Sequence, residues 1–213
     1  MVAVAIHDTP LVADGIGTCL KEHNHTYTGT IHGIEDAEQL FAEHDVNVVI
    51  IDPKANKETG MELVQWVQEH YPKCPIVLLV PKVSDELIDA AAHLQVAAVL
   101  DKGIHANDLA RFVERVARGE RLLSGEEVKS ARARLERQGY ATLANLGDVD
   151  KDIMAAIGNG YTDREIANIV YLSPQTVRNR VSRLLQRLGR ENRTQLALML
   201  RDYDDVFGRF QAG

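Results

Sequence analysis

The 213-residue sequence contains few cysteines, few aromatic residues and no long apolar segment. Its two cysteines, Cys19 and Cys74, have no metal-ligand spacing and are too few for a disulfide framework, so we interpret them as buried free thiols. No apolar run approaches the roughly 20 residues that span a bilayer, and the N-terminus lacks the layout of a signal peptide. These absences predict a cytoplasmic protein with no membrane partner.

Charge is distributed unevenly along the chain. Residues 1–121 contain 10 Lys and Arg residues against 19 Asp and Glu residues, a net charge of −9, whereas residues 122–213 contain 14 against 12, a net charge of +2. Between residues 162 and 201, 8 arginines accompany 3 acidic residues. An acidic first half and a basic segment behind it indicate two domains, the second of which faces a polyanion.

Short apolar runs alternate with helix-like stretches in the first half. The runs are "VAVAI" (2–6), "TYTGTI" (26–31), "NVVIID" (47–52), "IVLLV" (76–80) and "AAVL" (97–100). This alternation predicts an α/β domain over 1–121, with a parallel sheet and helices on both faces. A partly helical linker over 122–147 and an all-α domain over 148–213 follow. In such sheets a site lies at the carboxyl ends of the strands, where the sequence places Asp8, Asp52, Pro81 and Lys102.

The stretch "YTDREIANIVYLSPQTVRNRVSRLLQRLG" (161–189) carries start signals for two short helices. Thr162 opens a T-x-x-E capping box, which predicts a helix over 163–170. Ser173 is a favoured N-cap and is followed by proline, which predicts a second helix over 174–188. Two short capped helices around a tight turn form a helix-turn-helix, in which the second helix recognises DNA.

The second of these helices has two chemically different faces. Its apolar stripe consists of Val177, Val181, Leu184, Leu185 and Leu188. The opposite face carries Arg178, Asn179 and Ser182, and these side-chain types bind guanine, adenine and several base edges in the major groove. Further arginines neutralise phosphates and set the register, and we assign this role to Arg164, Arg180, Arg183 and Arg187.

This segment resembles the LuxR-type helix-turn-helix of NarL/FixJ-type regulators over 148–202, in the residues "REIA", "LS", "TV", "NRVSR", "LG" and "RTQLAL". The resemblance implies a four-helix domain that binds double-stranded DNA as a homodimer. It implies base recognition by Arg178, Asn179 and Ser182, and phosphate contacts by Thr176 and Arg183. The last helix, over 193–203, would then form the dimer contact through an apolar stripe of Leu196, Met199 and Leu200.

With such a domain behind it, the first half resembles the receiver domain of a response regulator, with a flavodoxin-like (βα)5 fold. A typical receiver transfers a phosphoryl group to an aspartate. This reaction needs an acidic pair for Mg²⁺, the acceptor, a hydroxyl group and a lysine. By resemblance, Asp52 is the acceptor, Lys102 is the lysine, and Asp8 is one acid of the pair.

Several positions depart from the receiver pattern, four of them at the predicted site. His7 stands where the second acid is expected, Val80 stands at the hydroxyl position, and Val99 stands at the aromatic position. Pro81 follows Val80, and proline has no backbone N–H to hold a phosphoryl group. Because imidazole suits Mg²⁺ poorly, we expect no magnesium cofactor and no ordinary phosphorylation. Instead we expect an ion pair between Asp52 and Lys102, in a domain that serves dimerisation or a partner protein.

The sequence therefore predicts a non-enzymatic, sequence-specific transcription regulator that is controlled without standard phosphorylation. One alternative from the same class is a conventional response regulator phosphorylated on Asp52, and an alternative outside it is a protein-binding adaptor that no longer binds DNA. Two others are a small hydrolase with Asp52 as nucleophile and a transition-metal site at His7, Asp8 and Asp52. We interpret the nearby histidines His23, His25 and His32 as surface residues without a metal.

Overall fold

The computed structural model describes residues 1–55, 60–140, 143 and 145–207. The chain divides into two compact units, Met1–Val128 and Lys129–Gly213. None of the helices in these described stretches is long and apolar enough to cross a membrane.

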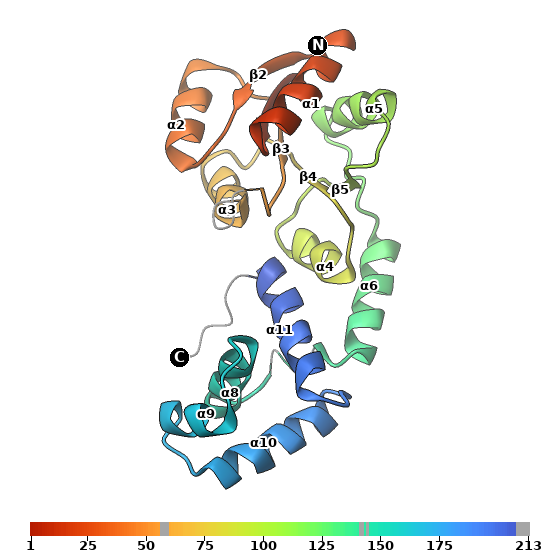
Figure 1. Cartoon of the computed structure of the whole chain (residues 1–213). Helices are drawn as coiled ribbons and strands as arrows, with labels where there is room; N and C mark the ends of the chain where they lie inside the picture. The colour runs from red at the N-terminus through yellow and green to blue at the C-terminus, as the bar shows by residue number, and fades with distance from the viewer. Residues whose placement is uncertain (56–59, 141–142, 144, 208–213) are drawn as a thin grey trace. The chain divides into compact units, whose positions relative to one another are not determined.

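The first unit is built on a five-stranded parallel sheet (Figure 1). Its strands lie in the order β2-β1-β3-β4-β5. Their bounds are β1 Ala3–His7, β2 Thr26–Thr30, β3 Val48–Ile51, β4 Ile76–Val80 and β5 Ala98–Asp101. The direction of strand succession reverses between β1 and β3, so residues that follow these two strands lie at the switch point where ligands bind in open α/β sheets.

Helices cover both faces of this sheet. They are α1 Pro10–Glu22, α2 Ile34–Glu43, α3 Gly60–His70, α4 Asp85–His93 and α5 Ala106–Ala117. Leu20 of α1 and Val113 of α5 share one apolar cluster with Ile6. Ile51 and Leu78 belong to the other alternating set of strand residues and are also buried, because side chains alternate between faces. The predicted flavodoxin-like (βα)5 fold is confirmed.

The second unit is helical and has a core of its own. Helix α6 Gly125–Arg137 begins in the last residues of the first unit and continues into the second, which also contains α8 Asp148–Gly158, α9 Asp163–Ile169, α10 Pro174–Arg187 and α11 Arg193–Phe207. Figure 1 shows α8 to α11 as the four helices expected for the helix-turn-helix domain. Leu135, Tyr140 and Leu146 come from the segment that the sequence suggested as a linker, and they are buried in the same core.

Candidate nucleic-acid interface and receiver site

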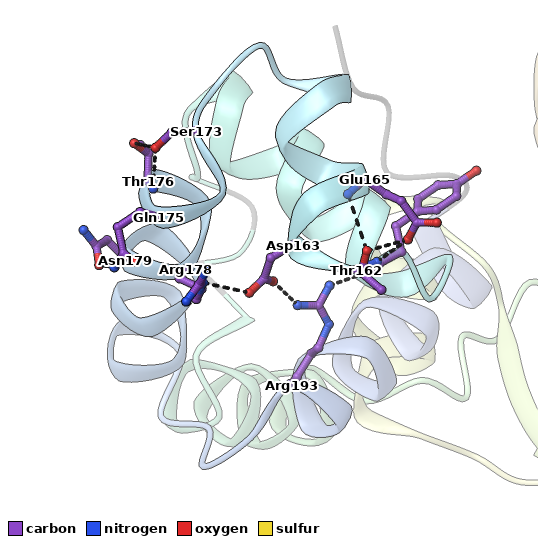
Figure 2. A network of polar contacts seen from close by, with 10 residues as sticks. Thr162, Asp163, Glu165, Ser173, Gln175, Thr176, Arg178, Asn179 and Arg193 are labelled. Carbon is purple, nitrogen blue, oxygen red and sulfur yellow. Dashed lines mark hydrogen bonds and ion pairs between the residues drawn. The ribbon is translucent and has the colours of Figure 1, made fainter.

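Helices α9 and α10 form the predicted helix-turn-helix, and its caps are present (Figure 2). The backbone N–H of Glu165 donates to Thr162 Oγ1, and the Thr162 N–H donates to the Glu165 carboxylate at 2.7 Å, which completes the capping box. The Thr162 N–H and the Thr162 hydroxyl both donate to the Glu165 carboxylate, and these two hydrogen bonds lower the pKa of Glu165 below its usual value. At α10, Ser173 Oγ accepts from the Thr176 N–H at 3.1 Å, so both helices begin where the sequence predicts.

Helix α10 separates its apolar and polar side chains as expected. Val177, Val181 and Leu184 are buried in the core of the second unit, together with Leu188, and Leu185 is half-buried. Most of the predicted DNA contacts are exposed: Arg164, Arg178, Asn179, Ser182, Arg183 and Arg187. Gln175 donates to Asn179 Oδ1 at 3.1 Å. One face of α10 therefore offers hydrogen-bonding groups to solvent.

Two aspartates lie on the flanks of this face. Asp150 of α8 accepts from Arg180 Nη1 at 2.7 Å and lies 3.8 Å from Arg187 Nη1. Asp163 of α9 lies 3.8 Å from Arg178 Nε (Figure 2). Arg180 is half-buried against Asp150, so a phosphate contact would require it to leave this partner. Thr176, which is also predicted to contact a phosphate, is likewise only partly exposed. Its Oγ1 lies 2.8 Å from Ser173 Oγ.

The apolar stripe of α11 that was predicted to form the dimer contact lies inside the second unit instead. Leu196, Met199 and Leu200 are 0–3% exposed and belong to the core of the second unit. A side chain packed inside its own domain is not available to a second copy, so this prediction was wrong. The apolar stripe of an amphipathic helix marks the face that is covered first, which here is the domain core. On the outer side of α11, Leu198 is 43% exposed.

In the first unit, Lys102 lies between the two aspartates at the strand ends. Its Nζ is 2.6 Å from Asp8 Oδ2 and 2.7 Å from Asp52 Oδ2, and both carboxylates are almost completely buried. Asp8 Oδ1 accepts from the Thr9 N–H, and Asp52 Oδ1 accepts from the Lys54 N–H. Burial alone lowers the pKa of Lys102, but the hydrogen bonds and charges of Asp52 and Asp8 outweigh it and raise that pKa. The expected ion pair is present and includes Asp8 as a second partner.

His7 is fully buried beside this ion pair. Its Nδ1 lies 3.1 Å from the backbone oxygen of Asp52, and because a carbonyl only accepts, Nδ1 carries the proton of this hydrogen bond. Burial lowers the pKa of His7, and the neighbouring Asp52 opposes this effect without overcoming it. Within the described ranges no group of three or more His, Cys, Asp or Glu side chains is arranged to hold a metal ion.

The other three positions that depart from the receiver pattern surround the same edge. Val80 ends β4 and is buried, Pro81 is exposed directly after it, and Val99 is half-buried in β5. The Val80 carbonyl accepts from the Lys102 N–H at 2.7 Å. The edge therefore presents an alkyl group and a proline ring where a hydroxyl and an amide were expected from the resemblance.

The histidine and cysteine interpretations need correction. His25 is buried against α5, 3.9 Å from Glu114, and is not a surface residue. His23 is hydrogen-bonded to the Cys19 carbonyl and to Asn107. Both cysteines are free but only half-buried, and burial raises the pKa of Cys74 to about 12.

Three residues of the nucleic-acid interface are absent from the sequence prediction. They are Asp150, Asp163 and Arg193, which pair with residues 30 positions away in the chain. The only local signal is an acidic residue in the first turn of α8 and of α9. Helix-dipole stabilisation explains such a residue equally well, so the sequence did not identify them as partners of the arginines.

Both parts of the chain match known sequence families. Residues 3–114 match the family described as "Response regulator receiver domain", and residues 144–200 match "Bacterial regulatory proteins, luxR family". The chain is 31% identical over 154 residues to the "DNA-binding transcriptional activator DevR/DosR" of Mycobacterium tuberculosis, with 71% of each chain covered. It is 23% identical over 168 residues to the "Response regulator protein VraR" of Staphylococcus aureus, covering 78% of this chain and 80% of that protein.

Solved structures show the same fold. RcsB from Salmonella enterica serovar Typhimurium, bound to promoter DNA in the presence of the phosphomimetic BeF3-, matches with a TM-score of 0.66 and 20% identity. That match covers 97% of this chain and 98% of RcsB. A second RcsB–DNA complex matches with a TM-score of 0.64 and 20% identity, covering 94% of this chain and 98% of that chain.

Proposed function

The chain belongs to the response regulators that join a receiver domain to a luxR-type DNA-binding domain, and on this basis we propose that it is a sequence-specific transcription regulator. The observation that carries the proposal is the capped α9–α10 pair, which buries Val177 and Val181 and exposes Arg178 and Asn179. Its relative DevR/DosR is named as a DNA-binding transcriptional activator. The proposal includes no enzymatic activity, and DNA binding implies action in the cytoplasm.

In this proposal α10 enters the major groove of double-stranded DNA. Arg178 binds guanine through two hydrogen bonds, Asn179 binds adenine, and Ser182 contacts a base edge or a phosphate. Arg183, Arg187, Arg164, Thr176 and Arg180 contact the phosphate backbone, which supplies affinity and register without sequence information.

A homodimer is part of the proposal, because two copies bind paired half-sites with more buried surface than one copy does. The outer side of α11 supports it, since Leu198 is an exposed large apolar residue on that helix. The receiver unit then serves as a second contact surface, for the other copy or for a partner protein.

We further propose that the receiver works without standard phosphorylation and without magnesium. Both carboxylates of the edge already contact Lys102. His7 donates from Nδ1 to a carbonyl and offers no oxygen to a metal that prefers oxygen ligands. The donor set therefore does not fit Mg²⁺. Val80 and Pro81 offer no hydrogen bond to a phosphoryl group, and each missing charge-assisted hydrogen bond costs about 1.5–3 kcal/mol.

The DNA-binding proposal is tested by selecting bound duplexes from a library with a randomised central segment. The expected result is one enriched sequence whose affinity falls steeply with salt, since phosphate contacts release counterions. Arg178→Ala should lose about tenfold or more in affinity for that sequence and lose the preference at one base pair. Lys129→Ala removes an exposed positive charge of α6 that the proposal does not assign to DNA or to the dimer, and it serves as the control for base preference. Enrichment of no sequence would support the adaptor alternative.

A further inference from the structure

We propose that Asp163 is a positioning residue for Arg178, and that it sets how strongly the recognition helix discriminates between bases. The inference rests on the proposed DNA binding by α10. It concerns the network in Figure 2, where Asp163 lies between an arginine of the recognition helix and an arginine of α11.

Asp163 is held firmly from one side. It is the first residue of α9, and its Oδ1 accepts from Arg193 Nη1 at 2.7 Å. Arg193 is the first residue of α11 and also donates to the backbone oxygen of Tyr161. Both side chains are only about one-third exposed, at 28% and 35%. The carboxylate is thus fixed by two helices, and its second oxygen points toward α10 (Figure 2).

The contact of Asp163 with Arg178 is of a different kind. Asp163 Oδ2 lies 3.8 Å from Arg178 Nε, and the Arg178 side chain is 61% exposed. An exposed ion pair at this distance is weak, and it involves Nε rather than the two Nη groups that would donate to a base, so Arg178 can bind a base while the pair is kept. While the pair lasts, it restricts a side chain that otherwise has many rotamers to the α9 side of α10, which lowers the entropy cost of binding there.

This arrangement favours discrimination between bases over affinity. The carboxylate of Asp163 repels DNA phosphates at every sequence, and it competes with a phosphate for Arg178. Held through Nε, Arg178 can direct both Nη groups to guanine O6 and N7, whereas it is less able to turn toward a phosphate or another base. An element that disfavours the wrong partner in this way raises specificity while it lowers overall affinity.

Asp150 provides a matched control on the opposite flank. It is also an acidic residue in the first turn of a helix, and it pairs with Arg180 and Arg187 of α10. Arg178 and Arg180 are two residues apart and so point about 200° apart around the helix axis. Asp163→Asn and Asp150→Asn each remove one negative charge beside α10, but they release different arginines.

The experiment repeats the duplex selection with the full chain and its Asp163→Asn and Asp150→Asn variants. The base pair that Arg178 contacts is defined as the one whose preference is lost in Arg178→Ala. For Asp163→Asn we expect about threefold to tenfold less preference at that base pair, and tighter binding to unrelated duplexes. Asp150→Asn should also bind unrelated duplexes more tightly, but it should keep the preference at that base pair.

Three further variants guard against a merely structural effect. Asp163→Glu keeps the charge and should retain most of the preference. Arg193→Gln releases Asp163 from α11 and should weaken the preference at the same base pair. In the Arg178→Ala background, Asp163→Asn should change no base preference, because coupled residues lose their joint effect together.

Two results would overturn the inference while the proposed DNA binding stands. One is an unchanged preference in Asp163→Asn and Arg193→Gln, and the other is an equal change in Asp163→Asn and Asp150→Asn. If the unaltered chain enriches no sequence at all, the proposed function fails instead, and the inference fails with it. The three cases give different selection results and cannot be confused.

Discussion

The two units of this protein both contain aspartates beside a basic side chain, and they use the same charges in opposite ways. In the first unit, Lys102 contacts two almost completely buried carboxylates at 2.6 and 2.7 Å. In the second, Arg178 is exposed and lies 3.8 Å from Asp163. A buried charge that loses its partner is costly, whereas an exposed charge can exchange its partner for another. These geometries fit the proposals made above, of a first cluster that keeps its own cation and a second that takes a further partner.

The sharpest test of the first cluster is its reaction with a phosphoryl donor. Incubated with acetyl phosphate and Mg²⁺, the chain should show no phosphoryl adduct by intact mass, because hydrogen-bond donors and a metal ligand are missing. A variant that combines His7→Asp, Val80→Thr and Pro81→Ala restores these groups and should gain one adduct. Asp52→Asn in that background should abolish it. An Asp52-dependent adduct on the unaltered chain would show that the first cluster is an ordinary phosphorylation site.

The next largest effect compares the same kind of substitution in both units. Lys102→Met should destabilise the first unit by roughly 3–5 kcal/mol, because it leaves two buried carboxylates without their cation. Arg178→Met should change the stability of the second unit by less than about 0.5 kcal/mol, because its side chain is exposed. The single tryptophan, Trp66, lies in α3 and reports urea unfolding of the first unit by fluorescence. Circular dichroism reports the helical second unit. Similar losses of unfolding free energy in both variants would contradict the contrast between a buried and an exposed cation.

The smallest effect is a pH dependence of the stability of the first unit, to which His7 in the buried cluster contributes. The pKa of His7 is lowered in the folded chain, so below about pH 6.5 the unfolded chain binds a proton that the folded chain does not. Stability of the first unit should therefore fall as the pH drops below this value. His7→Asn keeps a hydrogen-bond donor near the Asp52 carbonyl, and it should reduce the slope of the free energy of unfolding against pH. His25, whose pKa is also lowered, accounts for part of the remaining slope. An unchanged slope in His7→Asn would show that His7 does not contribute.

The helices of the second unit show how far local sequence patterns extend. The capping box at Thr162 and the N-cap at Ser173 are formed as predicted, since each depends only on residues within one helical turn. The stripe of Leu196, Met199 and Leu200 was identified correctly as apolar, but its partner was not. Periodicity defines the face of a helix that is covered and contains no information about what covers it.

At the receiver edge, the prediction that Asp52 pairs with Lys102 followed from strand order, because parallel strands end at one edge of the sheet. The second contact, between Lys102 and Asp8, depends on how a long side chain bends over that edge. The burial of His25 under α5 likewise depends on packing between segments far apart in sequence. Such details could not be obtained from spacing along the chain.

The sequence by itself determined which segments along the chain form strands and helices. It also determined the two caps of the helix-turn-helix and the residue types on the recognition face. These features depend on neighbours within a few positions. Only the tertiary structure decided which carboxylate each cation meets, because pairs such as Arg193 and Asp163 are separated by 30 residues and are brought together by packing of α9 against the start of α11. In the same way, the fold of each unit decided that Lys102 contacts two buried carboxylates and that Arg178 is exposed.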